Sequence, residues 1–73
     1  MRITYGPAAD AACIYLAPRR PGMSKETIPM DIAGRAFAFD FGADGRLSYI
    51  EVLDASKVLP ASVLKAASRP ADP

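Results

Sequence analysis

The chain has 73 residues, 51% of them hydrophobic, with nine basic and eight acidic residues that give a net charge of +1 at neutral pH. A chain of this length forms one domain with a marginal core, because folding buries only about 60% of the surface that the unfolded chain exposes. The nearly balanced charge excludes the clustered basic face that nucleic-acid binding requires, so we expect no nucleic-acid partner.

The cysteine and histidine counts restrict how so small a domain is stabilised. The single cysteine, Cys13, excludes a disulfide within the chain, and with no histidine present a structural zinc site is excluded as well. Small scaffolds without such links often associate, which predicts a homodimer. The unpaired cysteine predicts a cytoplasmic protein. No leader-like segment and no apolar run near membrane length is present, so we expect no membrane partner.

The first half of the chain predicts three strands. Residues 2–5 alternate between polar and apolar side chains, and residues 11–16 are apolar on both faces, as is typical of a strand inside a sheet. Residues 18–22 contain two prolines and a glycine and are expected to form a loop. Residues 27–32 alternate again, but Pro29 lacks an amide donor, which predicts an edge strand.

The second half contains the clearest alternation. Residues 35–41 and 47–53 predict two strands, and the Asp-Gly pair at 44–45 is typical of a two-residue hairpin turn. The pairs that such a turn predicts are Ala43–Arg46, Phe39–Ile50, Phe37–Val52, Asp40–Tyr49 and Ala38–Glu51. Apolar side chains then meet on one face, whereas Asp40 and Glu51 become diagonal neighbours on the other.

The C-terminal part predicts one short helix. Asp54 follows the last strand and is a candidate helix N-cap. Pro60 suits the first position of a helix over residues 60–67, where its missing amide costs nothing. The sequence therefore predicts an α+β fold with a mostly antiparallel sheet of four to five strands and one short C-terminal helix. This single domain is expected over residues 1–68, with residues 69–73 as a flexible tail.

Residues 40–51 match the calcium-loop pattern D-x-[DN]-x-[DN]-G-x5-E at every specified position except one. Asp40, Asp44 and Glu51 occupy ligand positions of that pattern, but Gly42 supplies no side-chain oxygen at the third position. An EF-hand loop also needs a helix on each side, whereas these flanks alternate as strands. The hairpin turn is therefore the favoured interpretation, and calcium binding through the three carboxylates is the alternative.

No catalytic residues are predicted. Asp40 and Glu51 could share a proton or activate a water if they were buried together. With no histidine in the chain, however, there is no base for a nucleophile such as Cys13, Ser48 or Ser56. A chain this small also rarely encloses a pocket. We therefore expect a non-enzymatic protein that uses no cofactor.

The three phenylalanines of residues 35–41 share one face of their strand. Such a set at period two is more typical of a core or a subunit interface than of a ligand site. Because one short helix cannot cover the whole face, a second copy or a partner protein is expected on the remainder. The predicted interface residues are Phe37, Phe39, Phe41, Ile50 and Val52.

Two segments resemble the domain of unknown function 2283 family of small bacterial proteins. The first matches a Tyr-Asp-Pro-x-Ala-Asp-Ala turn at Tyr5, Pro7, Ala9, Asp10 and Ala11. The second matches the family's closing Asp-x-Asp-x-Asp-Gly-Arg-Leu-x-x-Ile-Glu-Ile-Leu-Asp-Ala-Ser at Asp40, Asp44, Gly45, Arg46, Leu47, Ile50, Glu51, Leu53, Asp54, Ala55 and Ser56. Gly6 and Gly42 stand where the family usually has aspartate.

The resemblance implies a compact antiparallel β domain with a C-terminal helix and no established activity. Some relatives sit beside small toxin-like genes, which implies an antitoxin or partner-binding role. Our leading hypothesis is a non-enzymatic, self-associating interaction module, the neutralising partner of a small bacterial toxin. Its contacts are expected from the sheet face, the edge at residues 27–32 or the segment after Pro60. The alternative is a divalent-cation domain built on Asp40, Asp44 and Glu51.

Overall fold

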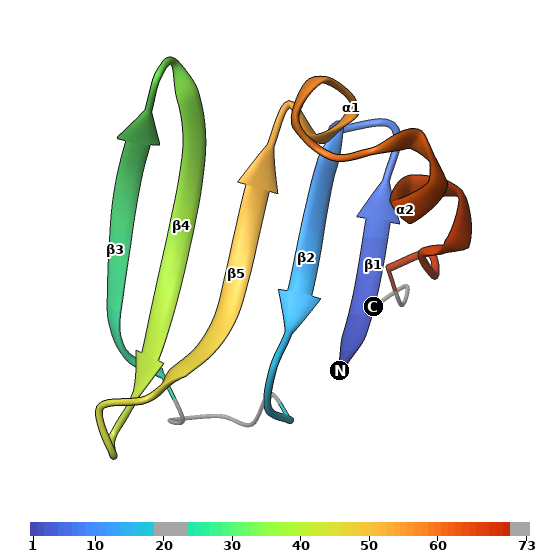
Figure 1. The fold of residues 1–73 in the computed structure, drawn as a ribbon. Helices are drawn as coiled ribbons and strands as arrows, with labels where there is room; N and C mark the ends of the chain where they lie inside the picture. Colours follow the sequence, from blue (N-terminus) through green and yellow to red (C-terminus); the bar gives the residue numbers. More distant parts are fainter. Residues whose placement is uncertain (19–23, 71–73) are drawn as a thin grey trace.

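The fold is known from a computed structural model, which describes residues 1–18 and 24–70. These residues form a five-stranded antiparallel sheet followed by two short helices (Figure 1). The elements are β1 (Arg2–Gly6), β2 (Ala11–Tyr15), β3 (Ser24–Ile32), β4 (Arg35–Gly42), β5 (Leu47–Leu53), α1 (Ala55–Val58) and α2 (Ala61–Ala66). The α+β class and the antiparallel sheet are thus confirmed. Of the predicted loop at 18–22, only Pro18 lies within the described residues.

The strands lie in the order β1-β2-β5-β4-β3, so β3 is an edge strand, as its proline predicts, and β2 is an interior one. The free side of β1 is occupied by the chain after α2. The Tyr5 amide donates to the Ser68 carbonyl at 2.8 Å, and the Ser68 amide donates to the Ile3 carbonyl at 3.0 Å. Beyond this bridge, Pro70 lies beside Gly6, where an added Cβ would stand 3.4 Å from its ring. Residues 71–73 of the predicted tail lie outside the described residues.

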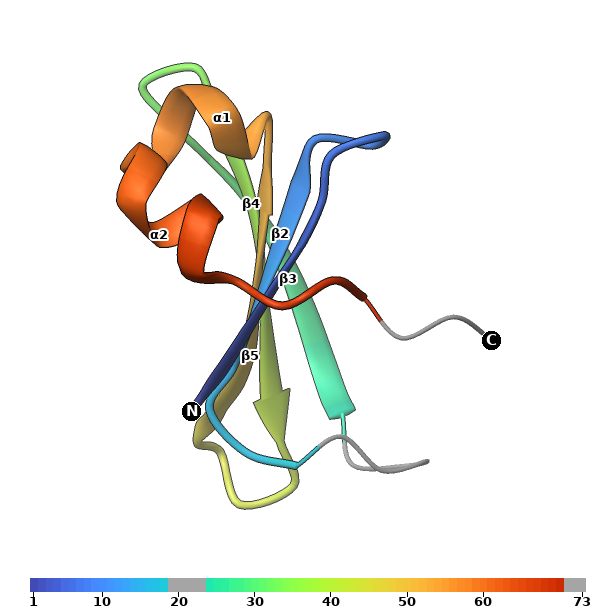
Figure 2. The ribbon, with the colours of Figure 1, turned by 90° about the vertical axis from the view of Figure 1, so that its right-hand side faces the viewer.

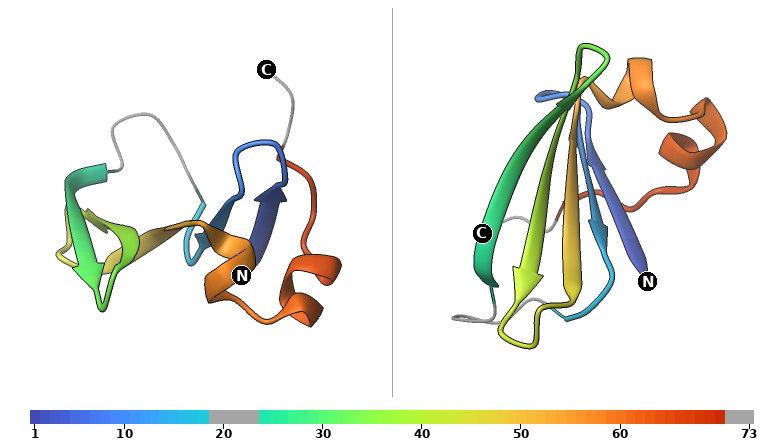
Figure 3. Two further views of the ribbon diagram at one scale, coloured as in Figure 1. Left: turned by 90° about the horizontal axis from the view of Figure 1, so that it is seen from above. Right: turned by 60° about the vertical axis from the view of Figure 1, so that its left-hand side comes forward.

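Both helices lie on one side of the sheet (Figure 2) and cover only its β1–β2 end (Figure 3). Among the described residues, the fully buried hydrophobic side chains are Ala12, Val52 and Ala55, which come from β2, β5 and α1. Leu64 of α2 and Phe37 of β4 pack against this cluster. The core is therefore small and sits under the helices, while the β4–β3 end of the same face extends past them.

The prediction of one helix is wrong because α1 forms directly after β5. Asp54 does occupy its N-cap position, in the left-handed region at φ 50°, but its side chain makes no capping hydrogen bond. The cap comes instead from Asp10, described below. Pro60 is the N-cap residue of α2 rather than its first helical residue. A four-residue helix such as α1 is too short to show a helical period in the sequence.

The β4–β5 hairpin has the predicted register over its strands but not at its turn. The pairs Phe37–Val52, Ala38–Glu51, Phe39–Ile50 and Asp40–Tyr49 are confirmed. The predicted Ala43–Arg46 pair is wrong, because the Gly42 amide donates to the Arg46 carbonyl at 2.9 Å and so pairs those two residues.

The loop of this hairpin therefore has three residues, Ala43 to Gly45. Within it only Gly45 takes a positive φ, 79°, whereas a type I′ two-residue turn needs positive φ at both positions. Phe41 pairs with Leu47, so Ser48 is the extra residue of a bulge that restores the predicted register beyond it.

The β3–β4 hairpin does have a two-residue turn. Ile32 pairs with Arg35, and the residues between them, Ala33 and Gly34, have φ of 53° and 79°, as a type I′ turn requires. The turn fixes the register of the edge strand, which places apolar side chains of β3 beside the phenylalanines of β4.

Candidate functional site

The candidate site is an open apolar surface at the β4–β3 end of the sheet. We call it the aromatic face, and it consists of Phe37, Phe39 and Phe41 of β4 with Ile28, Met30 and Ile32 of β3. Alternation places these side chains on the side that carries the helices, because Phe37 pairs with the core residue Val52. The rings of Phe37 and Phe39 stack with centroids 6.1 Å apart. Met30 is 44% exposed and Ile32 is 49% exposed.

The predicted interface residues divide between this surface and the core. Phe37, Phe39 and Phe41 lie on the aromatic face, each partly buried. Val52 is only 1% exposed and belongs to the core, against which Ile50 packs. These two residues support the face from the neighbouring strand rather than line its open part.

Sequence reasoning missed the contribution of β3. The alternation of residues 27–32 was recognised, but the strand was not paired with a neighbour. The signal that would have paired it is Ala33-Gly34, because a two-residue turn there sets Met30 opposite Phe37 and Ile28 opposite Phe39. The three aliphatic side chains of β3 are what make the aromatic face two strands wide.

Charged side chains bracket the aromatic face at its two ends. Arg35 pairs with Ile32 beside the β3–β4 turn, and Glu26 pairs with Phe41 at the other end. Both are exposed, and alternation puts both on the aromatic face. The one described contact of the Arg35 guanidinium is with the Ala33 carbonyl at 3.3 Å. The face is therefore positive in its first row, apolar over the two middle rows, and negative in its last row.

The opposite face of the sheet carries a polar aromatic cluster. The Tyr49 hydroxyl donates to Cys13 Sγ at 2.9 Å, and the rings of Tyr49 and Tyr15 lie 5.1 Å apart. Burial and the hydrogen bond to Cys13 raise the pKa of Tyr49 above its ordinary value of 10.0. The Tyr49 hydroxyl therefore stays protonated at neutral pH and cannot serve Cys13 as a base.

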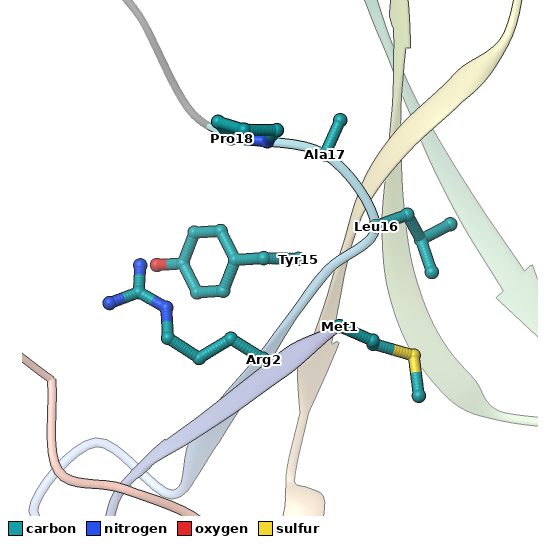
Figure 4. A pocket seen from close by; sticks show the side chains of 6 residues that line it. All are labelled: Met1, Arg2, Tyr15, Leu16, Ala17 and Pro18. Atoms are coloured by element: carbon teal, nitrogen blue, oxygen red, sulfur yellow. The ribbon is translucent and has the colours of Figure 1, made fainter.

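A hollow of about 500 Å³ lies at the end of this cluster (Figure 4). The Arg2 guanidinium carbon stands 4.3 Å from the centroid of the Tyr15 ring, a cation–π contact. The lining residues are Met1, Arg2, Tyr15, Leu16, Ala17 and Pro18. Among the described residues, this lining contains one cationic side chain and no pair of nucleophile and base.

The three carboxylates of the calcium interpretation take different roles in the structure. Asp40 is only 4% exposed and lies in β4, opposite Tyr49. Asp44 Oδ1 accepts the Arg46 amide at 3.0 Å within the loop, and Glu51 lies in β5 opposite Ala38. The flanks of the loop are strands rather than helices, as predicted. Among residues 1–18 and 24–70, no three acidic, cysteine or histidine side chains lie close enough together to hold a metal ion.

A hydrogen-bonded cluster that the sequence analysis missed joins the first turn to α1. Asp10 Oδ1 accepts the Tyr5 hydroxyl at 2.7 Å and the Ser56 amide at 2.9 Å, and its Oδ2 accepts the Ser56 hydroxyl at 2.7 Å. These bonds, from Ser56 first and then from Tyr5, lower the pKa of Asp10, and the bond to Asp10 raises the pKa of Tyr5. Asp10 thus caps α1 from a distant part of the chain, the role predicted for Asp54.

A protein-family model matches most of the chain. The model of a family described as a protein of unknown function, DUF2283, matches residues 2–56. No curated protein and no solved structure gives a significant match. The matched range contains all five strands and ends at Ser56, so it includes both residues of the Asp10–Ser56 hydrogen bonds that cap α1. Within the described residues, no helix is long and apolar enough to cross a bilayer.

Proposed function

The chain belongs to the DUF2283 family, whose function is unknown, and we propose that it is a non-enzymatic interaction module that associates with itself through the aromatic face. Two observations support the non-enzymatic part: the Tyr49 hydroxyl that donates to Cys13 stays protonated at neutral pH, and the described lining of the hollow at Tyr15 has no pair of nucleophile and base. The open apolar surface supports the part that concerns association.

The observation that carries the proposal is the exposure of apolar side chains on the aromatic face. Met30 is 44% exposed and Ile32 is 49% exposed, and Met30 lies opposite the partly buried Phe37 of β4. A contiguous apolar surface of this kind is typical of a protein–protein contact. A partner subunit would remove this surface from water.

The small core leads to the same conclusion. The fully buried hydrophobic side chains of the described residues include two alanines and one valine, and these contribute little apolar area. The larger side chains, Phe37, Phe39 and Ile50 among them, are only partly buried. Covering them with a partner would remove further apolar surface from water at about 25 cal/mol per Å².

A small bacterial toxin would be a second occupant of the same face. This finer form of the proposal is supported by the sequence resemblance alone. The toxin would compete with self-association, because the aromatic face cannot bind a toxin and a second copy of the chain at the same time.

Sedimentation velocity over a wide range of protein concentration tests self-association. We expect a dimer that dissociates on dilution, and a Met30→Lys variant that stays monomeric, because a lysine ammonium would be buried without a partner. Thr27→Lys is the matched control, since Thr27 is an exposed residue of the same strand whose side chain faces the other way. A wild-type chain that sediments as a monomer at every concentration would refute the proposal.

A further inference from the structure

We infer that the occupant of the aromatic face is a second copy of this chain, docked with its strands reversed, so that Arg35 of each copy meets Glu26 of the partner subunit. The inference rests on the proposed function and adds to it the geometry of the interface. It follows from the order of residues along the face and from the state of the two sheet edges.

The first step is the arrangement of the face in rows. Strand pairing gives four rows across β4 and β3, and the outer two carry the charges. In order along β4, the rows are Arg35–Ile32, Phe37–Met30, Phe39–Ile28 and Phe41–Glu26. The midpoint lies between the two inner rows, both of which are apolar. A twofold axis through this midpoint, running across the strands, superposes the apolar rows of one copy on those of the other.

The second step is the charge at the two ends. A twofold axis across the strands reverses the partner, so the partner's Arg35 arrives over Phe41, one strand away from Glu26. The facing sheets would be about 10 Å apart and neighbouring strands are about 4.8 Å apart, a separation that the arginine and glutamate side chains span together. A twofold axis along the strands would instead place Arg35 against the partner's Arg35. The end rows are about 20 Å apart, beyond the Debye length of about 8 Å, so each end acts independently. Charge therefore favours the reversed arrangement at both ends.

The third step is that neither sheet edge offers an uninterrupted row of backbone groups for strand addition. Ile32 of β3 and Arg35 of β4 flank the two-residue turn and form a hydrogen-bonded pair. Because hydrogen bonding to the neighbouring strand alternates from residue to residue, the backbone groups of Thr27, Pro29 and Asp31 point away from β4. Pro29 has no amide to donate at the middle of that edge. The free side of β1 is paired with Ser68. A second copy therefore docks on the face, and the edge at residues 27–32 is not its contact.

Charge reversal tests this geometry by sedimentation equilibrium. Glu26→Arg and Arg35→Glu are each expected to raise the dissociation constant of the dimer about tenfold or more, because each creates two like-charge contacts per dimer. The double variant Glu26→Arg/Arg35→Glu exchanges the two ends and is expected to return the constant to within about threefold of wild type. Added salt should lessen the effect of each single reversal, because both residues are exposed.

Arg46→Glu is the control for net charge, since Arg46 is exposed, pairs with Gly42 next to the β4–β5 loop and lies off the aromatic face. It should leave the dissociation constant unchanged. Circular dichroism should show the wild-type fold in every variant, because each replaced side chain is exposed. If the wild-type chain associates but the single reversals do not weaken it, or the double variant does not recover, the docking geometry is wrong while self-association stands. If the wild-type chain is monomeric throughout, the proposed function and this inference both fail.

Discussion

At the scale of the residue, Asp10 holds together parts of the chain that are far apart in sequence. Its backbone carbonyl accepts the Ala55 amide at 2.9 Å, and its carboxylate accepts both donors of Ser56 and the Tyr5 hydroxyl. The residue takes φ 51°, in the left-handed region, which aspartate tolerates better than most side chains. Asp10 therefore fixes the position of α1 beside the start of β2, which is a structural role.

The lowered pKa of Asp10 predicts a pH dependence of stability. A carboxylate whose folded pKa lies below the ordinary value of 3.8 stabilises the fold fully above that value, and the contribution is lost as pH falls toward the folded pKa. Asp10→Asn should therefore lower Tm at neutral pH, and the difference from wild type should narrow on acidification below 3.8. Thermal melts by circular dichroism measure both. Asp54→Asn is the matched control, since no capping hydrogen bond is lost there. A difference that stays constant with pH would contradict the prediction.

At the scale of the element, the β3–β4 hairpin contains one residue in an unfavourable conformation. Ala33 takes φ 53° in the type I′ turn, and a left-handed conformation costs an L-residue with a Cβ about 1–2 kcal/mol. Asn-Gly is the preferred pair for this turn. Ala33→Asn should therefore raise the free energy of unfolding by about 1 kcal/mol, or Tm by about 4–8 °C for a domain of this size. Ala43→Asn, in the other hairpin loop and without positive φ, should give no such gain. Equal effects of the two substitutions would show that backbone conformation is not the cause.

The β4–β5 hairpin predicts that calcium does not stabilise the protein. Asp44 already caps its own loop through the Arg46 amide, and Asp40 is buried in a strand rather than presented by a loop. A bound ion would stabilise the fold by about 2.7 kcal/mol at a hundred times its dissociation constant, so binding would be visible as a rise in Tm. We expect no change in Tm at millimolar calcium. A rise that Asp44→Asn abolishes would instead support the calcium interpretation.

The same hairpin shows how far the sequence could predict the structure. Alternation and the three phenylalanines were sufficient for the register from Phe37 to Asp40, because a shift by one residue would expose every apolar side chain of the strand. The three-residue loop shifts the pairing of β4 with β5 by one residue, and the bulge at Ser48 shifts it back. The alternation of side chains is therefore unchanged beyond the bulge, and the sequence pattern does not reveal either feature. The Asp10–Ser56 contact spans 46 positions and depends on how β2 and β5 are paired, which local patterns do not contain.

At the scale of the whole molecule, the sheet is wider than its helices can cover. The described residues have extents of 33 × 30 × 20 Å, with the helices over one end of the sheet only. The sequence predicted that a single short helix would leave part of the face open. The second helix does not change this, since α1 and α2 both lie at the β1–β2 end. The exposed apolar area is therefore a property of the topology, and a second subunit would complete the layer that the helices begin.

If the second subunit completes this layer, folding and association are linked, and Tm must depend on protein concentration. By mass action, a hundredfold increase in concentration stabilises the dimer by about 2.7 kcal/mol, which corresponds to about 5–10 °C in Tm. Differential scanning calorimetry across that range measures the shift. Met30→Lys should melt at a lower temperature that does not change with concentration, because its monomer keeps the core of Ala12, Val52 and Ala55 but has no partner to gain. A concentration-independent Tm for the wild-type chain would mean that the subunit is stable alone with its aromatic face exposed, contrary to the marginal core described above.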